Sequence, residues 1–489
     1  MPDSTQTLRV LPEILLSVFG TLVMILDPLV GRNRQGLLGG LALVGTYCAG
    51  IASVLGYADP GPAFSGMVTL DGFATLFRLL ITVIGFLTVL ASMSYLKRDE
   101  LPEGEYYALI LFSLVGQSLM VSSGDLILIF LGLEISSIST YILAGFLRHD
   151  SKSSESALKY FFLGSFATAF LLYGIALIYG ATGSTNLAII RQTMGAREAD
   201  GLLAATAAAL MFVGLGFKVS AAPFQIWTPD VYQGAPSPVT AFLSTGPKAA
   251  AFAVFLRIFS TALAQSGSLW SWLLWTSALL SMTIGNFGAL SQTNIKRMLA
   301  YSSIAHAGYV LVAFTARTQL GAAAAMFYLV AYAFMNLGAF VVVSQLASRG
   351  ERYVEIEHYA GLGYRRPFLA ALLTIFLLSL IGIPLTGGFF GKFYIFRAAI
   401  NANLIGLAVL GLLNTAVAAY YYLKVIVYMY MREPMEQIPL DPVPSSIAAT
   451  LVVAGAAVFL LGVFPGPVLD FATRAAAGWG WESASVTVR

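Results

Sequence analysis

The sequence is divided into apolar runs of about 17–25 residues, the length that a helix needs to cross a bilayer. Polar or Gly/Pro-rich breaks separate these runs. Only 10% of the residues are charged, which is too few to cover a water-facing surface of this size. We therefore predict an all-α polytopic membrane protein. Its fourteen expected membrane helices lie near residues 11–30, 37–57, 70–95, 105–122, 125–147, 157–181, 202–232, 238–264, 269–290, 296–314, 320–347, 367–400, 404–430 and 445–464.

Two of the longest runs contain a break, at SAAPF and at GIPLTGGFFGK. Pro223 lies 118 residues after Glu105 (223 − 105), and Pro384 lies 116 residues after Ser268 (384 − 268). The starting residue of each interval opens a group of five predicted helices. Because five is odd, the second group begins on the opposite side of the membrane from the first. The spacing predicts two inverted five-helix repeats with two discontinuous helices, as in transporters whose broken helices mark the transport site.

This reading divides the chain into four parts. We expect an N-terminal three-helix segment (1–104), a first repeat (105–264), a second, inverted repeat (265–431), and a C-terminal helix with a tail (432–489). Loops after odd-numbered helices hold thirteen lysines and arginines, and loops after even-numbered helices hold three. The positive-inside rule then places the odd loops in the cytoplasm and both termini outside. The start, MPDSTQTLRV, lacks the features of a cleaved signal peptide.

Ligands for redox cofactors are scarce in this sequence. Cys48 is the only cysteine, so we expect neither a disulfide nor a cysteine-ligated iron–sulfur cluster. Of the three histidines, His149 and His358 fall in polar loops, which leaves His306 without an intramembrane partner for a haem or a metal. The sequence predicts that this chain binds no electron carrier and no metal.

Ionisable residues within the predicted helices are candidates for function by default. Lys218 illustrates why, because it lies five residues before Pro223. A lysine at the bilayer centre costs about 2.5–3.5 kcal/mol, and a proline inside a helix costs about 3. The candidate set is Glu134, Lys159, Lys218, Lys248, His306 and Lys392. A second set lies nearer helix ends, where snorkelling or a structural role is the expected reading: Arg78, Arg257, Arg397 and Lys424.

One carboxylate among several lysines suits proton transfer. Burial can lower the pKa of a lysine by about 3–5, whereas a carboxylate about 4 Å away opposes this by roughly 4 kcal/mol at an effective dielectric of about 20. Moving a proton against 150–200 mV takes roughly 3.5–4.6 kcal/mol. The effect of burial, the Glu–Lys attraction and the work of moving the proton are of similar size, since one pKa unit corresponds to about 1.4 kcal/mol. Making or breaking a Glu–Lys contact is therefore expected to switch a buried lysine between holding and releasing its proton. The break at Pro223 is expected to admit water beside Lys218.

Three stretches resemble the antiporter-like subunits of respiratory complex I: FQIWTPDVYQGAPSPVTAFLSTGPKAA, QTNIKRMLAYSSIAHAGY and GIPLTGGFFGKFYIF. The resemblance covers nearly the whole chain, and WTPDVYQGAPSPVTAF is closer to the N-type members of the family than to the M and L types. It implies a proton-translocating subunit of NADH:quinone oxidoreductase. Glu134, Lys218 and Lys248 match the family's main proton-handling residues. Lys159 matches a modulating lysine, His306 the connecting axis, and Lys392 the proposed outer exit.

The resemblance also implies where the other components lie. NADH, FMN, iron–sulfur clusters and quinone are expected in other subunits of the complex, and none on this chain. The expected partners are the antiporter-like subunit M, the small K/J/A-type membrane subunits and the lipid bilayer, with no nucleic acid. The expected location is the bacterial cytoplasmic (inner) membrane, with both termini on the periplasmic side.

Other functions remain open from the residues alone. A cation/proton antiporter complex shares the same fold and motifs. So do related ion-pumping assemblies, such as a membrane-bound hydrogenase or the photosynthetic relative of complex I. A structural scaffold whose lysines bind lipid is a fourth reading, but it gives no reason for the matched breaks or for the Glu/Lys set.

Overall fold

The computed structural model describes residues 4–30, 36–196, 200–264, 267–434 and 441–477, and these are nearly all helical. Twelve helices are long and apolar enough to cross a membrane, and two shorter apolar helices complete the predicted fourteen. They are α2 (Leu11–Leu26), α3 (Leu37–Gly56), α4 (Gly72–Asp99), α5 (Glu103–Ser122), α6 (Leu126–Ala144), α7 (Ser151–Thr182), α9 (Gly201–Val219), α11 with α12 (Ser237–Leu243, Gly246–Arg257), α13 (Gly267–Leu290), α14 (Ile295–Thr315), α15 (Gln319–Leu346), α17 (Pro367–Ile381), α19 (Ile405–Met431) and α20 (Ser445–Val463).

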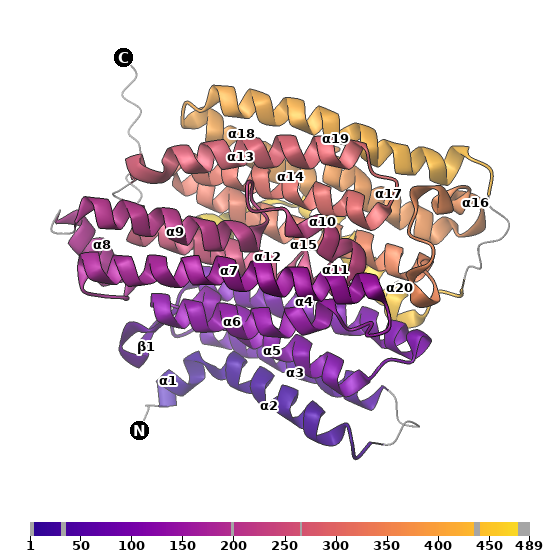
Figure 1. The fold of residues 1–489 in the computed structure, drawn as a ribbon, viewed down its shortest axis with the longest axis horizontal. Helices are drawn as coiled ribbons and strands as arrows, with labels where there is room; N and C mark the ends of the chain where they lie inside the picture. Colours follow the sequence, from indigo (N-terminus) through magenta and orange to yellow (C-terminus); the bar gives the residue numbers. More distant parts are fainter. Residues whose placement is uncertain (1–3, 31–35, 197–199, 265–266, 435–440, 478–489) are drawn as a thin grey trace.

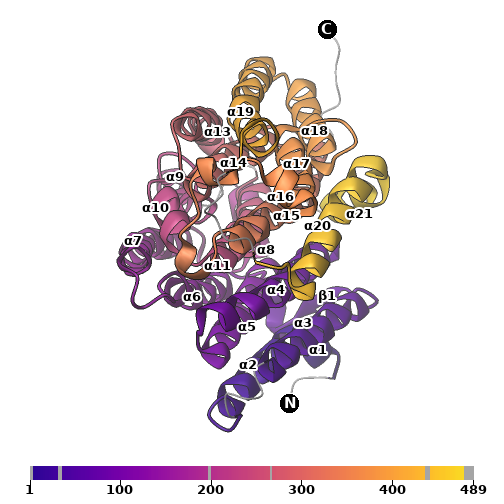
Figure 2. The same cartoon turned by 90° about the vertical axis from the view of Figure 1, so that its right-hand side faces the viewer.

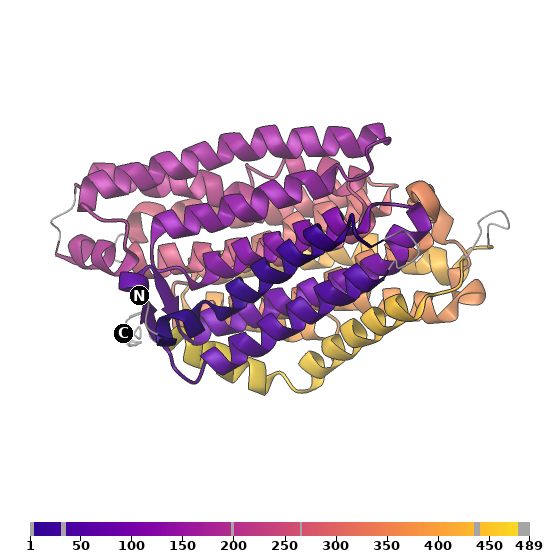
Figure 3. The same ribbon diagram turned by 90° about the horizontal axis from the view of Figure 1, so that it is seen from below.

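The helices run side by side along the longest axis of the molecule (Figure 1). Viewed end-on, α2, α3 and α5 form one flank, and α13, α18 and α19 lie at the other (Figure 2). The first helix, α1 (Ser4–Arg9), and the last, α21 (Gly466–Ala476), lie at the same end (Figure 3). Arg9 of α1 pairs with Asp59 at 3.1 Å, and the ring of Phe471 in α21 lies 5.6 Å from that of Tyr57.

Several short elements at the ends of the bundle were not predicted. A hairpin of β1 (Gly61–Ala63) and β2 (Val68–Leu70) follows α3, so the fold is not purely helical. These strands have three residues each, which is too short to give a signal of alternating hydrophobicity. The remaining unpredicted short elements are η2 (Phe64–Gly66), α8 (Leu187–Gly195), η3 (Ile258–Ala262), η5 (Arg349–Glu351), η6 (Ile356–Tyr359) and α16 (Leu362–Arg365). Helices α10 (Trp227–Gly234) and α18 (Gly387–Asn401) are the second halves of the two predicted discontinuous helices.

Both predicted helix breaks are present. The first separates α9 from α10 at Ser220 (φ 62°), and the second separates α17 from α18 at Gly382 (φ 96°). Backbone groups released inside a membrane protein need internal partners. At the first break, Ser281 Oγ accepts from the Ala222 N–H (2.8 Å) and Ser277 Oγ donates to the Ala222 carbonyl (2.6 Å). Helix α13 therefore stabilises the interruption in the preceding half of the chain.

The two halves of the bundle repeat one backbone device. An isolated bridge pairs Asp125 with Asn186, and another pairs Asn294 with Glu355. Both partners are offset by the same interval, since 294 − 125 and 355 − 186 each equal 169. The flanking hydrogen bonds match as well: Leu126 N–H to the Thr185 carbonyl (2.9 Å), and Ile295 N–H to the Val354 carbonyl (2.8 Å). Each device opens the second helix of a five-helix group, which is the arrangement expected of an internal repeat.

A buried ion pair joins the N-terminal helix to the bundle. Arg78 on α4 donates to Glu13 on α2 at 2.6 Å, and both side chains are almost fully buried. Ser118 on α5 donates to the same carboxylate oxygen at 2.6 Å. Its position near a helix end predicts a structural or lipid-anchoring role for Arg78. The structure shows a structural one, because the ion pair and Ser118 tie three helices together.

Replacing Glu13 with glutamine is expected to destabilise the fold strongly. It leaves the buried Arg78 charge uncompensated, a loss typically of about 3–5 kcal/mol. The thermal unfolding temperature of the purified protein in detergent measures this effect. Arg148→Ala is the control, because Arg148 and Glu105 form an exposed pair worth about 0–1 kcal/mol. Equal stability of both variants would contradict the assigned role of the buried pair.

Candidate functional site

Lys218 lies in the last turn of α9, directly before the first break, and its side chain is half-buried. Its Nζ donates to the Tyr141 hydroxyl at 3.3 Å. It also lies 4.9 Å from the centre of the Tyr141 ring and 5.2 Å from that of Tyr160. Aromatic faces and a hydroxyl, rather than a carboxylate, therefore surround the ammonium group.

Glu134 lies on α6 and is partly buried. Its Oε1 is buried and has no hydrogen-bond partner among the described residues. Within the described part of the chain, no lysine or arginine lies within ion-pair distance of Glu134. The Glu–Lys contact considered in the sequence analysis is thus not closed in this conformation. The carboxylate stands unpaired on the helix that also carries Tyr141, the partner of Lys218.

Lys248 lies in the first turn of α12 and is only 2% exposed. Its Nζ donates to Ser303 on α14, to Oγ at 2.5 Å and to the backbone carbonyl at 3.2 Å. The Tyr332 hydroxyl on α15 donates to the same Ser303 oxygen at 2.8 Å. The Ser303 hydroxyl therefore takes the place of water around a buried lysine.

His306 lies one helical turn beyond Ser303 on α14 and is buried. Its two ring nitrogens face two tyrosine hydroxyls: Nδ1 pairs with Tyr328, and Nε2 with Tyr422 at 3.0 Å. Tyr422 also hydrogen-bonds Ser302. Apolar periodicity does not reveal these tyrosines, because their rings belong to the core and only their hydroxyls are polar.

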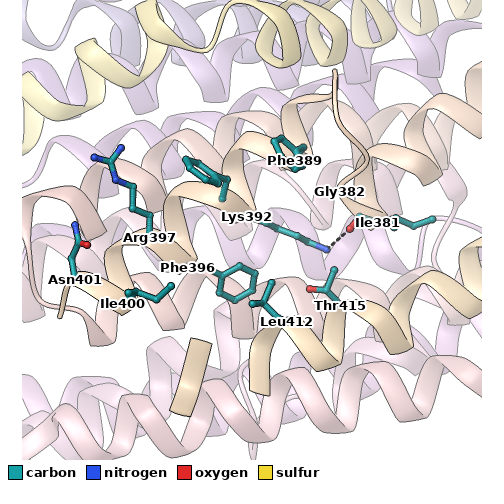
Figure 4. A pocket seen from close by; sticks show the side chains of 11 residues that line it. Ile381, Gly382, Phe389, Lys392, Phe396, Arg397, Ile400, Asn401, Leu412 and Thr415 are labelled. Atoms are coloured by element: carbon teal, nitrogen blue, oxygen red, sulfur yellow. Dashed lines mark hydrogen bonds between the residues drawn. The ribbon is translucent and has the colours of Figure 1, made fainter. Parts of the chain in front are cut away.

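Lys392 lies on α18 and reaches back across the second break. Its Nζ donates to the carbonyls of Leu380 and Ile381, at 2.9 and 3.0 Å, and lies 4.7 Å from the centre of the Tyr309 ring. These carbonyls are released where α17 ends, at the negative end of its dipole. A cavity of about 420 Å³ adjoins the lysine. Figure 4 shows the ammonium directed at Ile381, whereas Arg397 points away from it.

Three of the predicted residues therefore lie in one connected group. Ser303 and Tyr332 link Lys248 to the His306 ring, which lies 5.2 Å from the Tyr332 ring. The His306 and Tyr309 rings are 5.7 Å apart, and Tyr309 contacts Lys392. Lys218 and Glu134 form a separate group beside Tyr141. No side-chain hydrogen bond among the described residues joins the two groups directly.

Lys159 is placed differently from the other candidates. It lies near the start of α7 with 40% of its side chain exposed, and it pairs with Glu155 and Asp230, each at 2.7 Å. Arg297 pairs with the other oxygen of Asp230 at 2.6 Å. A small cavity of about 170 Å³ adjoins this network. Its lining is polar and consists of Lys152, Glu155, Ser156, Asp230, Gln233 and Gly234.

The sequence analysis missed a buried charge cluster around Glu351. This loop residue accepts from Lys296 Nζ (2.5 Å), the Tyr95 hydroxyl (3.1 Å) and both the N–H and the hydroxyl of Ser237 (2.5 and 2.9 Å). Burial by itself would raise the pKa of Glu351, but the Lys296 ammonium and the Ser237 hydrogen bonds hold it below the ordinary glutamate value. The cluster joins α4, α11 and α14 beneath a loop that sequence position alone marks as exposed.

The remaining intramembrane cations have structural partners or lie near the surface. Arg257 binds Asp71 through both terminal nitrogens, at 3.1 and 3.0 Å. Lys424 lies 3.5 Å from the Gln292 carbonyl, and Arg397 is exposed. In the described chain, no group of three or more His, Cys, Asp or Glu residues is arranged to hold a metal ion.

Residues 123–418 match the model of the NADH:quinone oxidoreductase/Mrp antiporter transmembrane family. This segment covers both helix breaks and every predicted relay residue. The chain belongs to this family. The resemblance inferred from its three motifs is therefore confirmed. Its closeness to the N type is confirmed by relatives named as subunit N.

Among its relatives in the family, the chain is 58% identical to NADH-quinone oxidoreductase subunit N 1 of Solibacter usitatus, over 96% of this chain and 97% of that protein. A chain of respiratory complex I from Thermus thermophilus, solved with bound aureothin, is 38% identical. It superposes with a TM-score of 0.81 over 94% of this chain and 99% of that one. A chain of the Mrp complex from Dietzia is 21% identical with a TM-score of 0.85, over 97% of this chain and 98% of that one, which shows the shared fold alone.

The Glu351 cluster generates a prediction about pH. Because the pKa of Glu351 is lower in the folded state, its stabilising effect is complete above the unfolded value of about 4.3 and is lost as pH falls through the folded value. Glu351→Gln is therefore expected to lower the unfolding temperature at neutral pH and to flatten its decline below about pH 4. Thermal unfolding measured between neutral and acidic pH tests this, with Glu105→Gln as the exposed control. A parallel decline in the wild type and Glu351→Gln would contradict it.

Proposed function

We propose that this protein is the N-type membrane subunit of an NADH:quinone oxidoreductase and that it translocates protons through Glu134, Lys218, Lys248, His306 and Lys392. The observation that carries the proposal is that the three lysines of this set have no carboxylate partner in the part of the chain that the structure describes. Among the described residues, none of these three lysines has a carboxylate within ion-pair distance. Hydroxyls, aromatic faces and backbone carbonyls hold them instead.

This environment suits groups that must change their protonation. A permanent buried charge is normally paired, as Arg78 is with Glu13 and Lys296 with Glu351. The proton affinity of a lysine held only by dipoles changes when any nearby charge moves, because no carboxylate compensates the charge of the lysine. Hydrogen bonds extend from Lys248 through Ser303 to Tyr332, and ring contacts continue through His306 and Tyr309 to Lys392. We assign proton transfer between the two lysines to this series of hydroxyl and imidazole groups.

The first half of the route begins at the polar cavity beside Lys159. This lysine is exposed and paired, so we assign it a modulating role at the uptake end rather than a place among the buried carriers. A proton taken up there reaches the Glu134–Lys218 group. Closing the Glu134–Lys218 contact in another conformation would raise the proton affinity of the lysine, and reopening it would release the proton inward.

The broader assignments follow from this proposal and from the family. The four-part division at residues 104, 264 and 431 is supported by the repeated bridges, and the end that carries Lys159, Arg297 and Glu351 faces the cytoplasm by the positive-inside rule. Both termini then lie on the periplasmic side of the bacterial inner membrane. NADH, FMN, iron–sulfur clusters and quinone reside in other subunits. The membrane partners are subunit M and the K/J/A-type subunits.

Lys218→Met and Glu134→Gln test the first half of the route. Each removes a titratable group with little change in side-chain volume, so proton pumping per quinone reduced is expected to fall by about tenfold or more. The measurement is fluorescence quenching of a pH-sensitive dye in vesicles that contain the assembled complex. Lys97→Met is the control, since Lys97 is exposed at the end of α4. Normal pumping with normal turnover in both variants would remove these residues from the route.

Lys392→Met tests the second half. The variant loses the ammonium that caps the Leu380 and Ile381 carbonyls. We therefore expect less pumping and a less well-fixed backbone at the second break. We expect pumping to fall by about tenfold. Lys424→Met on the neighbouring helix is a matched control with the same substitution outside the route. Lys392→Arg separates the two effects, because arginine keeps the cap but does not release a proton at neutral pH. Full pumping by Lys392→Arg would refute a proton-carrying role.

A further inference from the structure

The junction between α11 and α12 is a third interruption, which the sequence analysis did not predict. Helix α11 ends at Leu243 and α12 begins at Gly246, deep in the bundle. No side chain caps the N-terminus of α12, because the Thr245 hydroxyl donates to the Ala241 carbonyl (2.7 Å) instead. Pro247 has no N–H and the Ala249 N–H donates to the Thr245 carbonyl (2.8 Å), so Gly246 and Lys248 carry the first-turn amides without an intrahelical acceptor, and the helix dipole makes this end electropositive.

Gln117 on α5 points an acceptor at this N-terminus. The residue is 0% exposed, and its Nε2 donates to Ser113 Oγ at 3.0 Å. Its Oε1 has no hydrogen-bond partner among the described protein atoms. A β-carbon added to Gly246 would lie 2.8 Å from this oxygen, so the oxygen lies against the first residue of α12. The opposite amide orientation would aim N–H donors at other donors, so electrostatics favours the observed one.

Asn336 on α15 presents a second such oxygen at the same junction. It is also 0% exposed, and its Nδ2 donates to Ser244 Oγ at 2.7 Å. Its Oδ1 has no partner among the described protein atoms. Buried polar atoms in folded proteins are normally satisfied by protein groups or by ordered water. Two buried amide oxygens beside one uncapped helix start are the donor and acceptor set that holds water.

We propose that the α11–α12 junction is a water-binding site built by Gln117, Asn336 and the first turn of α12, and that its water connects Ser113 and Ser136 with Lys248. The Ser113 and Ser136 hydroxyls lie 3.0 Å apart, so the polar row runs from α6 across α5 to α12. Lys248 is the third residue of α12 and lies at the end of this row. Gln117 and Asn336 are thus positioning residues, and their role rests on the proposed function.

The site extends the polar surroundings of Lys248 to Ser136 on α6, the helix that also carries Glu134. A proton crosses it by exchange along water and the serine hydroxyls: each of these oxygens accepts one proton and gives up another, while the two amide oxygens only hold the water in place, so the intervening groups are unchanged at the end. The net result is one proton lost by the Glu134–Lys218 group and one gained by the Lys248 amine. No oxidant, reductant or further reactant is needed.

The direct test is a cryo-EM map of the assembled complex at a resolution that shows ordered water. A water within about 3 Å of Gln117 Oε1, and in contact with the first turn of α12, is the expected result. A map in which this oxygen bonds directly to a protein group, with no water at the junction, would overturn the proposal. This measurement needs no variant, so it remains decisive if a substitution prevents assembly.

The functional test uses Gln117→Leu and Gln117→Glu in the same complex. Leucine removes the acceptor at similar volume, and pumping is expected to fall about fivefold or more, the size of losing one polar group at a buried site. Glutamate keeps an acceptor oxygen and is expected to restore at least about half of the pumping. The control is Gln345→Leu, because Gln345 is buried on the same helix as Asn336 but bonds the Pro442 carbonyl (3.2 Å), outside the route.

The outcomes separate this inference from the proposed function. If Lys218→Met lowers pumping and Gln117→Leu does not, the relay stands and the water site is refuted. If neither variant lowers pumping, the relay itself fails, and the water site loses its role with it. Equal losses in Gln117→Leu, Gln117→Glu and Gln345→Leu would show a general structural effect and would also refute the positioning role.

Discussion

The structure depends on how a buried cation is stabilised without a counter-charge. Lys392 is held by two carbonyls at the end of α17, Lys248 by a serine, and Lys218 by a tyrosine. Such dipoles stabilise an ammonium less than a carboxylate does, but they also do not lock it in the charged state. At Lys392 an interrupted helix is the source of these dipoles, because a continuous helix satisfies its own carbonyls. At Lys248 and Lys218 the dipoles are side-chain hydroxyls of the neighbouring helices α14 and α6.

The two halves of the bundle share this arrangement but not its details. At the first break, the Trp227 indole N–H donates to the Phe217 carbonyl at 3.0 Å, so a neutral group caps the end of α9. At the second, Lys392 caps the end of α17 with a charge. The lysine precedes the break in the first half and follows it in the second. A repeat that kept both caps identical would give two equivalent carriers, whereas this difference gives the route two distinct ends.

The sequence predicted most of the fold because membrane helices have a fixed length and few charges. The fourteen helices, both long breaks and the depth of Lys248 and Lys392 follow from that constraint. It could not show that Lys159 is exposed, because hydropathy gives depth along a helix but not the side it faces. Nor could it reveal Glu351, whose left-handed backbone (φ 52°) folds a polar loop back into the bundle. The α11–α12 junction was hidden too, since a proline in the first turn of a helix is also compatible with an unbroken run.

The distribution of charge compensation separates cations that are paired with carboxylates from the lysines inside the bundle that are not. At the end that carries the positive loops, Lys159, Arg297 and Lys296 all have carboxylate partners, so their charges are fixed and the surface is held in one shape. Further inside, compensation by carboxylates gives way to compensation by hydroxyls and carbonyls. A lysine or arginine paired with a carboxylate resists losing its proton. The paired residues can therefore fix the shape of the surface and admit a proton, but they cannot relay it. On the proposed route, net movement of protons begins where the pairs stop, and in this bundle that boundary lies between Lys159 and the Glu134–Lys218 group.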